Sequence, residues 1–192
     1  MSSTRTTQQG VPPFDPAGFY EFDLEEGVVQ TRSGSRVVVL VAEAVGPLVA
    51  AAVARGDLTA MRRFGRAVGG QVASSLGQEP ASAPAEAVLG HLRPLFALFG
   101  WGKLRAERWG AALVLFVDDP PRLDEERLAL AALLGGALSA ASGRDVACVP
   151  VPGERFLVVA PSVAEQVWRW AHEGSSFLEI LARLEPVSEQ EG

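Results

Sequence analysis

Cysteine and histidine are scarce in this chain of 192 residues, which has one cysteine, Cys148, and two histidines, His91 and His172. A single thiol cannot form an internal disulfide, and such a composition is typical of proteins from a reducing compartment. Zinc sites usually combine four cysteine, histidine or acidic ligands, for which this set is too small. We therefore predict a cytoplasmic protein that holds no metal and no cofactor.

Long apolar runs and an excess of positive charge are also absent. The longest apolar candidates, residues 111–117 and 128–138, fall short of the eighteen or so residues that a membrane-spanning helix needs. The formal net charge of −6 argues against a nucleic-acid partner bound through bulk charge. Residues 1–13 are polar and lack the layout of a signal peptide. We expect no membrane span and no nucleic-acid partner.

Recognisable catalytic motifs are missing as well. Cys148 lies in an apolar strand-like run, where thiols behave as inert hydrophobes, and no G-x-S-x-G elbow or phosphate-binding loop occurs. Asp118 and Asp119 end another such run and could hold a divalent cation, but no partner acid follows at a recognisable spacing. The sequence therefore favours a protein that is not an enzyme.

The pattern of hydrophobic residues predicts a single α+β domain over residues 14–186, between a disordered tail at 1–13 and an acidic tail at 187–192. A hairpin is expected first, with its turn at 32–35 between the strand-like runs 19–31 and 37–41. The expected helices are 42–55, 58–76, 85–99, 125–142 and two more after residue 161; the expected strands are 103–109, 111–117, 146–149 and 156–159. Because the strands come in adjacent pairs, we predict an antiparallel sheet packed against several helices.

Capping residues and glycines mark several of these helices. Asp57 and Asp124 are good N-caps, and the pairs Ser162 with Glu165 and Ser176 with Glu179 have the spacing of a capping box. Three glycines at positions 65, 69 and 70, and two more at 135 and 136, fall inside expected helices, where they disfavour helix formation. Their presence there predicts that another element packs very close.

Two surfaces are candidates for binding a protein partner. Arg62, Arg63 and Arg66 form a basic face on an acidic chain and could dock an acidic partner or a phosphate group. Trp168 and Trp170 lie on one short amphipathic helix, which is rich in tryptophan for its length. A solvated arginine face and ordinary core packing of the tryptophans are the alternatives.

Residues 129–159 resemble the last part of the 4-vinyl reductase-like domain, a family distantly similar to the transport-protein-particle subunits of membrane-tethering complexes. The shared order is a small-residue helix with Gly136, then Gly143-Arg144, Val146, a turn at Gly153 and a final strand at 156–159. Residues 64–69 and 99–104 look like the family's earlier helix with glycines and its Gly-x-Gly segment before a strand. The resemblance covers about residues 37–160.

The resemblance implies an α+β scaffold that commonly dimerises and encloses an apolar cavity for small hydrophobic molecules or acyl chains. Better-known members carry an acidic residue and cysteines around the last hairpin, where they bind a metal or act in sensing. At that turn this chain has Cys148, and it has Phe156 where a second cysteine would be expected. A metal-dependent role therefore does not carry over.

Our leading hypothesis is a non-enzymatic regulatory or adaptor module that acts through protein–protein contacts. Its expected partners are a second copy of itself, as a homodimer, and an unidentified protein. The alternative is a small-molecule sensor with an apolar cavity between the sheet and the helices. The residues expected to contact such a ligand are Phe96, Phe99, Trp101 and Leu134.

Overall fold

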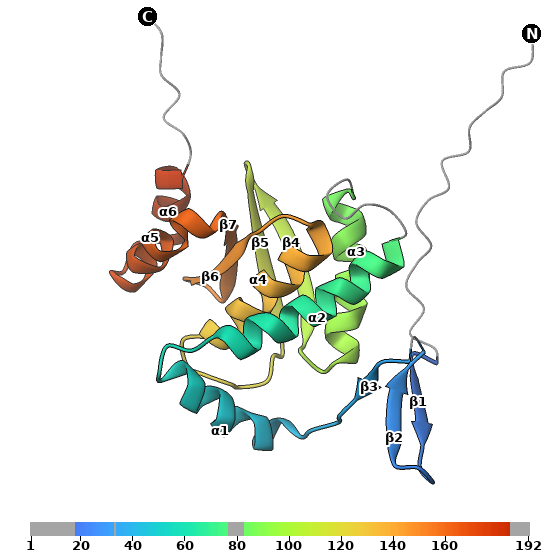
Figure 1. Cartoon of the computed structure of the whole chain (residues 1–192). Coiled ribbons are helices and arrows are strands. Elements are labelled where there is room, and N and C mark those ends of the chain that lie inside the picture. The colour runs from blue at the N-terminus through green and yellow to red at the C-terminus, as the bar shows by residue number, and fades with distance from the viewer. Residues whose placement is uncertain (1–17, 33, 77–82, 185–192) are drawn as a thin grey trace, which may run out of the picture.

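The structure is a computed structural model that describes residues 18–32, 34–76 and 83–184, so both predicted tails lie outside the described residues. It confirms a single α+β domain with antiparallel sheets packed against helices (Figure 1). The main sheet has the strands β4 (Lys103–Trp109), β5 (Ala112–Asp118), β6 (Ala147–Val151) and β7 (Arg155–Val159) in the order β4-β5-β7-β6. All neighbouring strands are antiparallel, as the paired strands of the sequence predict.

Helices cover both faces of this main sheet, because its central strands are apolar on both sides. Leu115 and Val117 of β5 face one layer of helices, whereas Val114 and Phe116, which alternate with them, face the other. The first layer contains α2 (Thr59–Leu76), α3 (Ala85–Leu98) and α4 (Leu128–Ser142). The second contains α5 (Pro161–His172) and α6 (Phe177–Leu184). The protein thus has two hydrophobic cores, and the larger one lies under α2, α3 and α4.

Helices α2 and α4 lie side by side with their backbones in contact. A Cβ atom added to Gly65 would overlap the carbonyl oxygen of Leu133, and one added to Gly69 would overlap that of Ala137. In the opposite direction, a Cβ on Gly136 would overlap the carbonyl oxygen of Arg62. These contacts confirm the predicted close packing. Gly70 is different, because a Cβ there would meet no atom within 4 Å.

The N-terminal segment forms a second, smaller sheet apart from the main one, with strands β1 (Tyr20–Asp23), β2 (Val28–Thr31) and β3 (Arg36–Val37). The predicted hairpin between 19–31 and 37–41 forms in part, since β2 pairs antiparallel with β3, with Val29 opposite Val37. The structure differs from the prediction within each of the two runs. The first run itself folds back at residues 24–27, because the Asp23 carboxylate accepts the backbone N–H groups of Glu25 and Glu26 and Gly27 adopts a φ of 65°. Only Val37 of the second run belongs to a strand, and residues 38–41 connect the small sheet to α1 (Ala42–Val53).

Three of the four predicted helix caps are confirmed. The Asp57 carboxylate accepts the N–H of Thr59, and both carboxylate oxygens of Asp124 accept N–H groups at the start of α4. The Ser176–Glu179 capping box forms in both directions. The Ser162 box is wrong, because the N-cap of α5 is Ala160, two residues before Ser162, and the helix begins at Pro161 with no side-chain cap.

Candidate functional site

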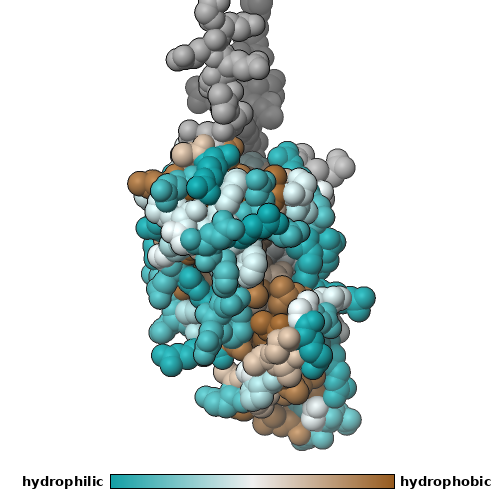
Figure 2. All heavy atoms as spheres, turned by 90° about the vertical axis from the view of Figure 1, so that its left-hand side faces the viewer, coloured by the Kyte–Doolittle hydropathy of each residue, from teal (hydrophilic) through white to brown (hydrophobic). Residues whose placement is uncertain are grey.

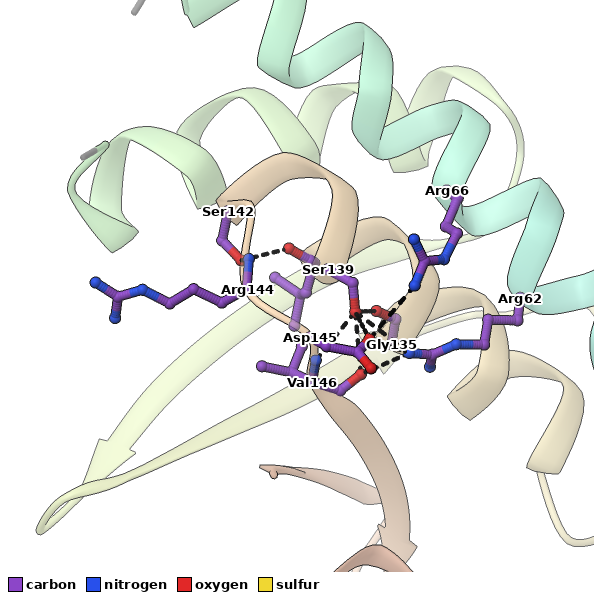
Figure 3. A network of polar contacts seen from close by, with 9 residues as sticks. Arg62, Arg66, Gly135, Ser139, Ser142, Arg144, Asp145 and Val146 are labelled. Atoms are coloured by element: carbon purple, nitrogen blue, oxygen red, sulfur yellow. Dashed lines mark hydrogen bonds and ion pairs between the residues drawn. The ribbon is translucent and has the colours of Figure 1, made fainter. Parts of the chain in front are cut away.

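Two of the three arginines of the predicted basic face are paired inside the chain (Figure 3). The guanidinium groups of Arg62 and Arg66 both reach Asp145 Oδ1, at 2.7 and 3.4 Å. Arg62 also donates to the backbone carbonyl of Val146, at 3.2 Å. The two arginines therefore tie α2 to the connection between α4 and β6. Arg63, the third predicted residue, is exposed and takes no part in this network.

Ser139 is the buried centre of the same network. Its hydroxyl lies 2.7 Å from the carbonyl of Gly135 and accepts the backbone N–H of Val146 at 3.1 Å. A serine in a helix interior commonly bonds the carbonyl four residues earlier, and here the same oxygen also receives the start of the next strand. The network explains why a buried polar residue is tolerated between two close-packed helices, since the hydrogen bonds of Ser139 are satisfied.

The two tryptophans of α5 do not form one exposed surface. Trp168 stacks on His172, with the ring centroids 4.9 Å apart. Trp170 faces α6, where the guanidinium of Arg183 lies 5.2 Å from its ring centroid. Both tryptophans are half-buried and pack against the second core. The structure thus places each of them partly in the core, on different sides of the helix.

The four residues expected to contact a ligand fall into two pairs. Phe96 and Leu134 are fully buried in the larger core. Phe99 and Trp101 are half-buried at its edge, where both rings contact Phe64, with centroids 6.2 and 5.4 Å away. The structure therefore joins Phe99 and Trp101 through an aromatic residue outside the predicted set.

A surface groove of the described residues lies between α1 and the loop that leads from β5 to α4; we call it the α1 groove. Its volume is about 700 Å³. It is lined by Ala50, Val53, Ala54, Pro120, Pro121, Arg122, Leu123, Asp124, Glu125, Glu126, Arg127 and Leu130. Its apolar residues come from α1, from Leu130 of α4, and from Leu123 and the two prolines of the loop, and its charged residues all come from the loop. Hydrophobic side chains gather low on the face shown in Figure 2, at the height of α1 in Figure 1.

The smaller groove, of about 340 Å³, runs along the edge strand β6, and we call it the β6 groove. It brings together Arg62 and Trp168, two of the residues predicted to bind a partner, and Cys148 also lines it. None of the four residues predicted to contact a ligand lines either groove. In the sequence, the α1 groove corresponds to the apolar segment of α1 and to Pro120-Pro121. The spacing of hydrophobic residues within each segment does not predict that the two segments meet.

The groups considered for chemistry are occupied or shielded. The Arg105 guanidinium donates to both oxygens of Asp118 at 2.8 Å, and these hydrogen bonds lower the pKa of that carboxyl. Burial raises the pKa of the Cys148 thiol to about 12, so it stays protonated at neutral pH. Within the described residues, no three cysteine, histidine or acidic side chains are placed to hold a metal ion. Nor is any helix of this part of the chain long and apolar enough to cross a membrane.

No protein-family model and no curated protein sequence matches the chain. Among solved structures, a similar fold occurs in the phenol-responsive sensory domain of the transcription activator PoxR, crystallised with phenol. The TM-score is 0.53 at 17% sequence identity, and the match covers 74% of this chain and 85% of that one. At this identity the similarity is one of fold.

Proposed function

We propose that this chain is a regulatory sensor domain that binds a small apolar molecule in the α1 groove and has no catalytic activity of its own. The observation that carries the proposal is the groove itself. Its volume of about 700 Å³ falls in the range of small-molecule sites, and its lining combines apolar side chains with charged ones from the loop. The fold shared with a phenol-responsive sensory domain supports the same class of function.

Helix α1 gives the groove an apolar wall. Apart from one glycine, one proline and one glutamate, its twelve residues are all alanine, valine or leucine. Only Val49 of them is buried. A helix this apolar is normally covered on most sides. Val49 joins α1 to the larger core, with Val45 and Val53 packed beside it, so most of the apolar surface of the helix is left for a ligand to cover. A ligand that covers Ala50 and Val53 would remove apolar surface that water now contacts.

The remaining groups fit a binding protein better than an enzyme. The Cys148 thiol is held protonated and Asp118 is paired with Arg105, so neither is poised for nucleophilic or acid–base work. We further infer that the chain is a divergent member of the 4-vinyl reductase-like family and that it works in the cytoplasm. The close-packed glycines at positions 65 and 136, both part of the resemblance, support the family assignment.

Filling the groove tests the proposal. Ala50 lines the groove and Ala51 beside it does not, although both are exposed on α1. We expect Ala50→Trp to reduce the binding of anilinonaphthalene sulfonate, a fluorescent apolar probe, at least several-fold. Ala51→Trp adds the same side chain to the same helix and is the matched control. Equal probe binding in the two variants would contradict the assignment of the groove.

A second candidate function is the adaptor role, acting through a homodimer and a further protein partner. It is favoured by exposed apolar residues that concentrate in the N-terminal part of the chain, from Phe22 to Leu48. Sedimentation of the full chain tests it, since an adaptor of this kind should self-associate. The two functions are compatible, because the α1 groove and these exposed residues involve different side chains.

A further inference from the structure

Four consecutive aliphatic residues are exposed between the small sheet and α1. Val38, Val39, Leu40 and Val41 have exposed fractions of 72, 72, 64 and 66%. They follow β3 directly, yet none of them belongs to a strand in the described structure. Valine and leucine at this density favour a paired strand that is at least half buried. The segment therefore has the composition of a buried strand and the surroundings of a surface loop.

The edges of the main sheet are protected against pairing, and this segment is not. The edge strand β6 carries Pro150, which cannot donate a ladder hydrogen bond, and the other edge strand, β4, carries charged residues along its length. Residues 38–41 contain neither proline nor charge. Proteins commonly block exposed strand edges that have no partner, so the unblocked segment indicates an edge that is paired in the working protein.

We propose that residues 38–41 of two copies of this chain pair as antiparallel strands about a two-fold axis and so form the homodimer. The segment is self-complementary in charge, because Arg36 precedes it and Glu43 follows it. An antiparallel alignment with Val39 opposite Leu40 of the partner subunit brings Arg36, in β3, to the end of the pair where Glu43 of the partner subunit stands in the first turn of α1. The two-fold symmetry repeats this approach at the other end. Both residues are exposed, and neither forms an ion pair within the described chain.

The exposed apolar area of this segment agrees with a symmetric dimer in which both copies contribute the same patch. The four side chains, together with Leu48 at 72% exposure, present on the order of 500 Å² of apolar surface. Apolar patches of that size on a protein surface are often functional. An isologous interface uses the patch of both copies, which brings the total close to the lower limit of about 1,200 Å² for stable complexes. A second copy thus supplies the area and the charge pattern at once.

Sedimentation velocity of the full chain tests the pairing. We expect the wild type to sediment at twice the chain mass of 20.3 kDa and Val39→Asp to sediment at the monomer mass. The dissociation constant of the dimer should rise at least ten-fold in the variant. Leu178→Asp is the matched control, because Leu178 is exposed to a similar extent, 65%, on α6 at the other end of the chain. Circular dichroism checks that each variant folds. A monomeric wild type, or a dimer that survives Val39→Asp, would overturn the proposal.

The alignment itself is tested by exchanging the charges. Arg36→Glu and Glu43→Arg each create two like-charge pairs and should weaken the dimer several-fold, whereas the double variant should restore it. Failure of the double variant to recover would refute this register. The inference rests on the self-association part of the proposed function. A failure of the dimer proposal is distinguishable from a failure of the ligand site. Ala50→Trp is tested by probe binding, whereas Val39→Asp is tested by the mass at which the chain sediments.

Discussion

Replacing single glycines of α2 with alanine should change stability in opposite directions at adjacent positions. Gly69 lies against α4, where an added Cβ would overlap the carbonyl oxygen of Ala137. Gly70 faces open space, with no atom within 4 Å of an added Cβ. Both residues are in the interior of the same helix, so the intrinsic effect of the substitution is the same at both. The difference between the two variants therefore isolates the contact between α2 and α4.

The magnitudes follow from two effects. Alanine stabilises a helix interior relative to glycine by about 0.5–1 kcal/mol, which is the whole effect expected for Gly70→Ala. At Gly69 the obstructing atom belongs to a helix backbone and cannot turn away, so the two helices must separate. Overpacking of this kind destabilises by about 1–3 kcal/mol, and more when backbones must move. We expect the free energies of unfolding of the two variants to differ by about 2–4 kcal/mol.

Equilibrium unfolding in urea measures this difference directly, provided that the slope m is unchanged. In a chain of this size, each kcal/mol corresponds to about 2–4 °C in the melting temperature, which gives an independent check. Gly65→Ala should behave like Gly69→Ala, because its Cβ would overlap the carbonyl oxygen of Leu133. Equal stabilities for the Gly69 and Gly70 variants would refute the close approach of α2 and α4.

Three further predictions concern individual side chains. Ser139→Ala should destabilise the protein by about 1–3 kcal/mol in urea unfolding, because it leaves the N–H of Val146 without its acceptor; an unchanged midpoint would contradict the role of this hydroxyl. Cys148 should resist iodoacetamide at neutral pH until the chain is unfolded, since burial raises the pKa of its thiol to about 12; rapid alkylation of the folded protein, followed by mass spectrometry, would show that the thiol is accessible. The hydrogen bond from the Ser176 backbone lowers the pKa of Glu179 below 4.5, so its stabilisation is present above that pH and is lost as the pH falls through the lowered value. The melting temperatures of the wild type and Glu179→Gln should therefore differ at about pH 6 and converge near about pH 3, and a gap that stays constant would argue against this cap.

Local signals in the sequence predict most of the main sheet and its helices. Strand β4 has the predicted bounds, and α4 is buried almost all round, as its leucines on every side predict. Asp124 caps α4 as expected, although the helix begins at Leu128, after Arg127 in a left-handed conformation. The glycines at positions 65 and 136 predict a close approach because only a packing partner compensates for their low helix propensity.

The errors arise where a tertiary or neighbouring contact decides between similar local patterns. The run 37–41 has a strand composition, but within one described chain only Val37 pairs, with Val29 of β2, and residues 38–41 belong to no strand. Arg62 and Arg66 look like a free basic face on a helical wheel, because their acceptor, Asp145, lies far along the chain. The α1 groove joins residues 50–54 to residues 120–130, and no periodicity within either segment predicts that they meet.

Native mass spectrometry of the chain purified from its own host tests the sensor function most directly. The wild type should carry a ligand with a mass on the order of a few hundred daltons that dissociates on denaturation, as expected for a site of this size. The ligand should be lost in Ala50→Trp, which fills the α1 groove, and retained in Ala51→Trp. A wild-type spectrum at the bare chain mass, or a ligand that persists in Ala50→Trp, would contradict a sensor site in the α1 groove.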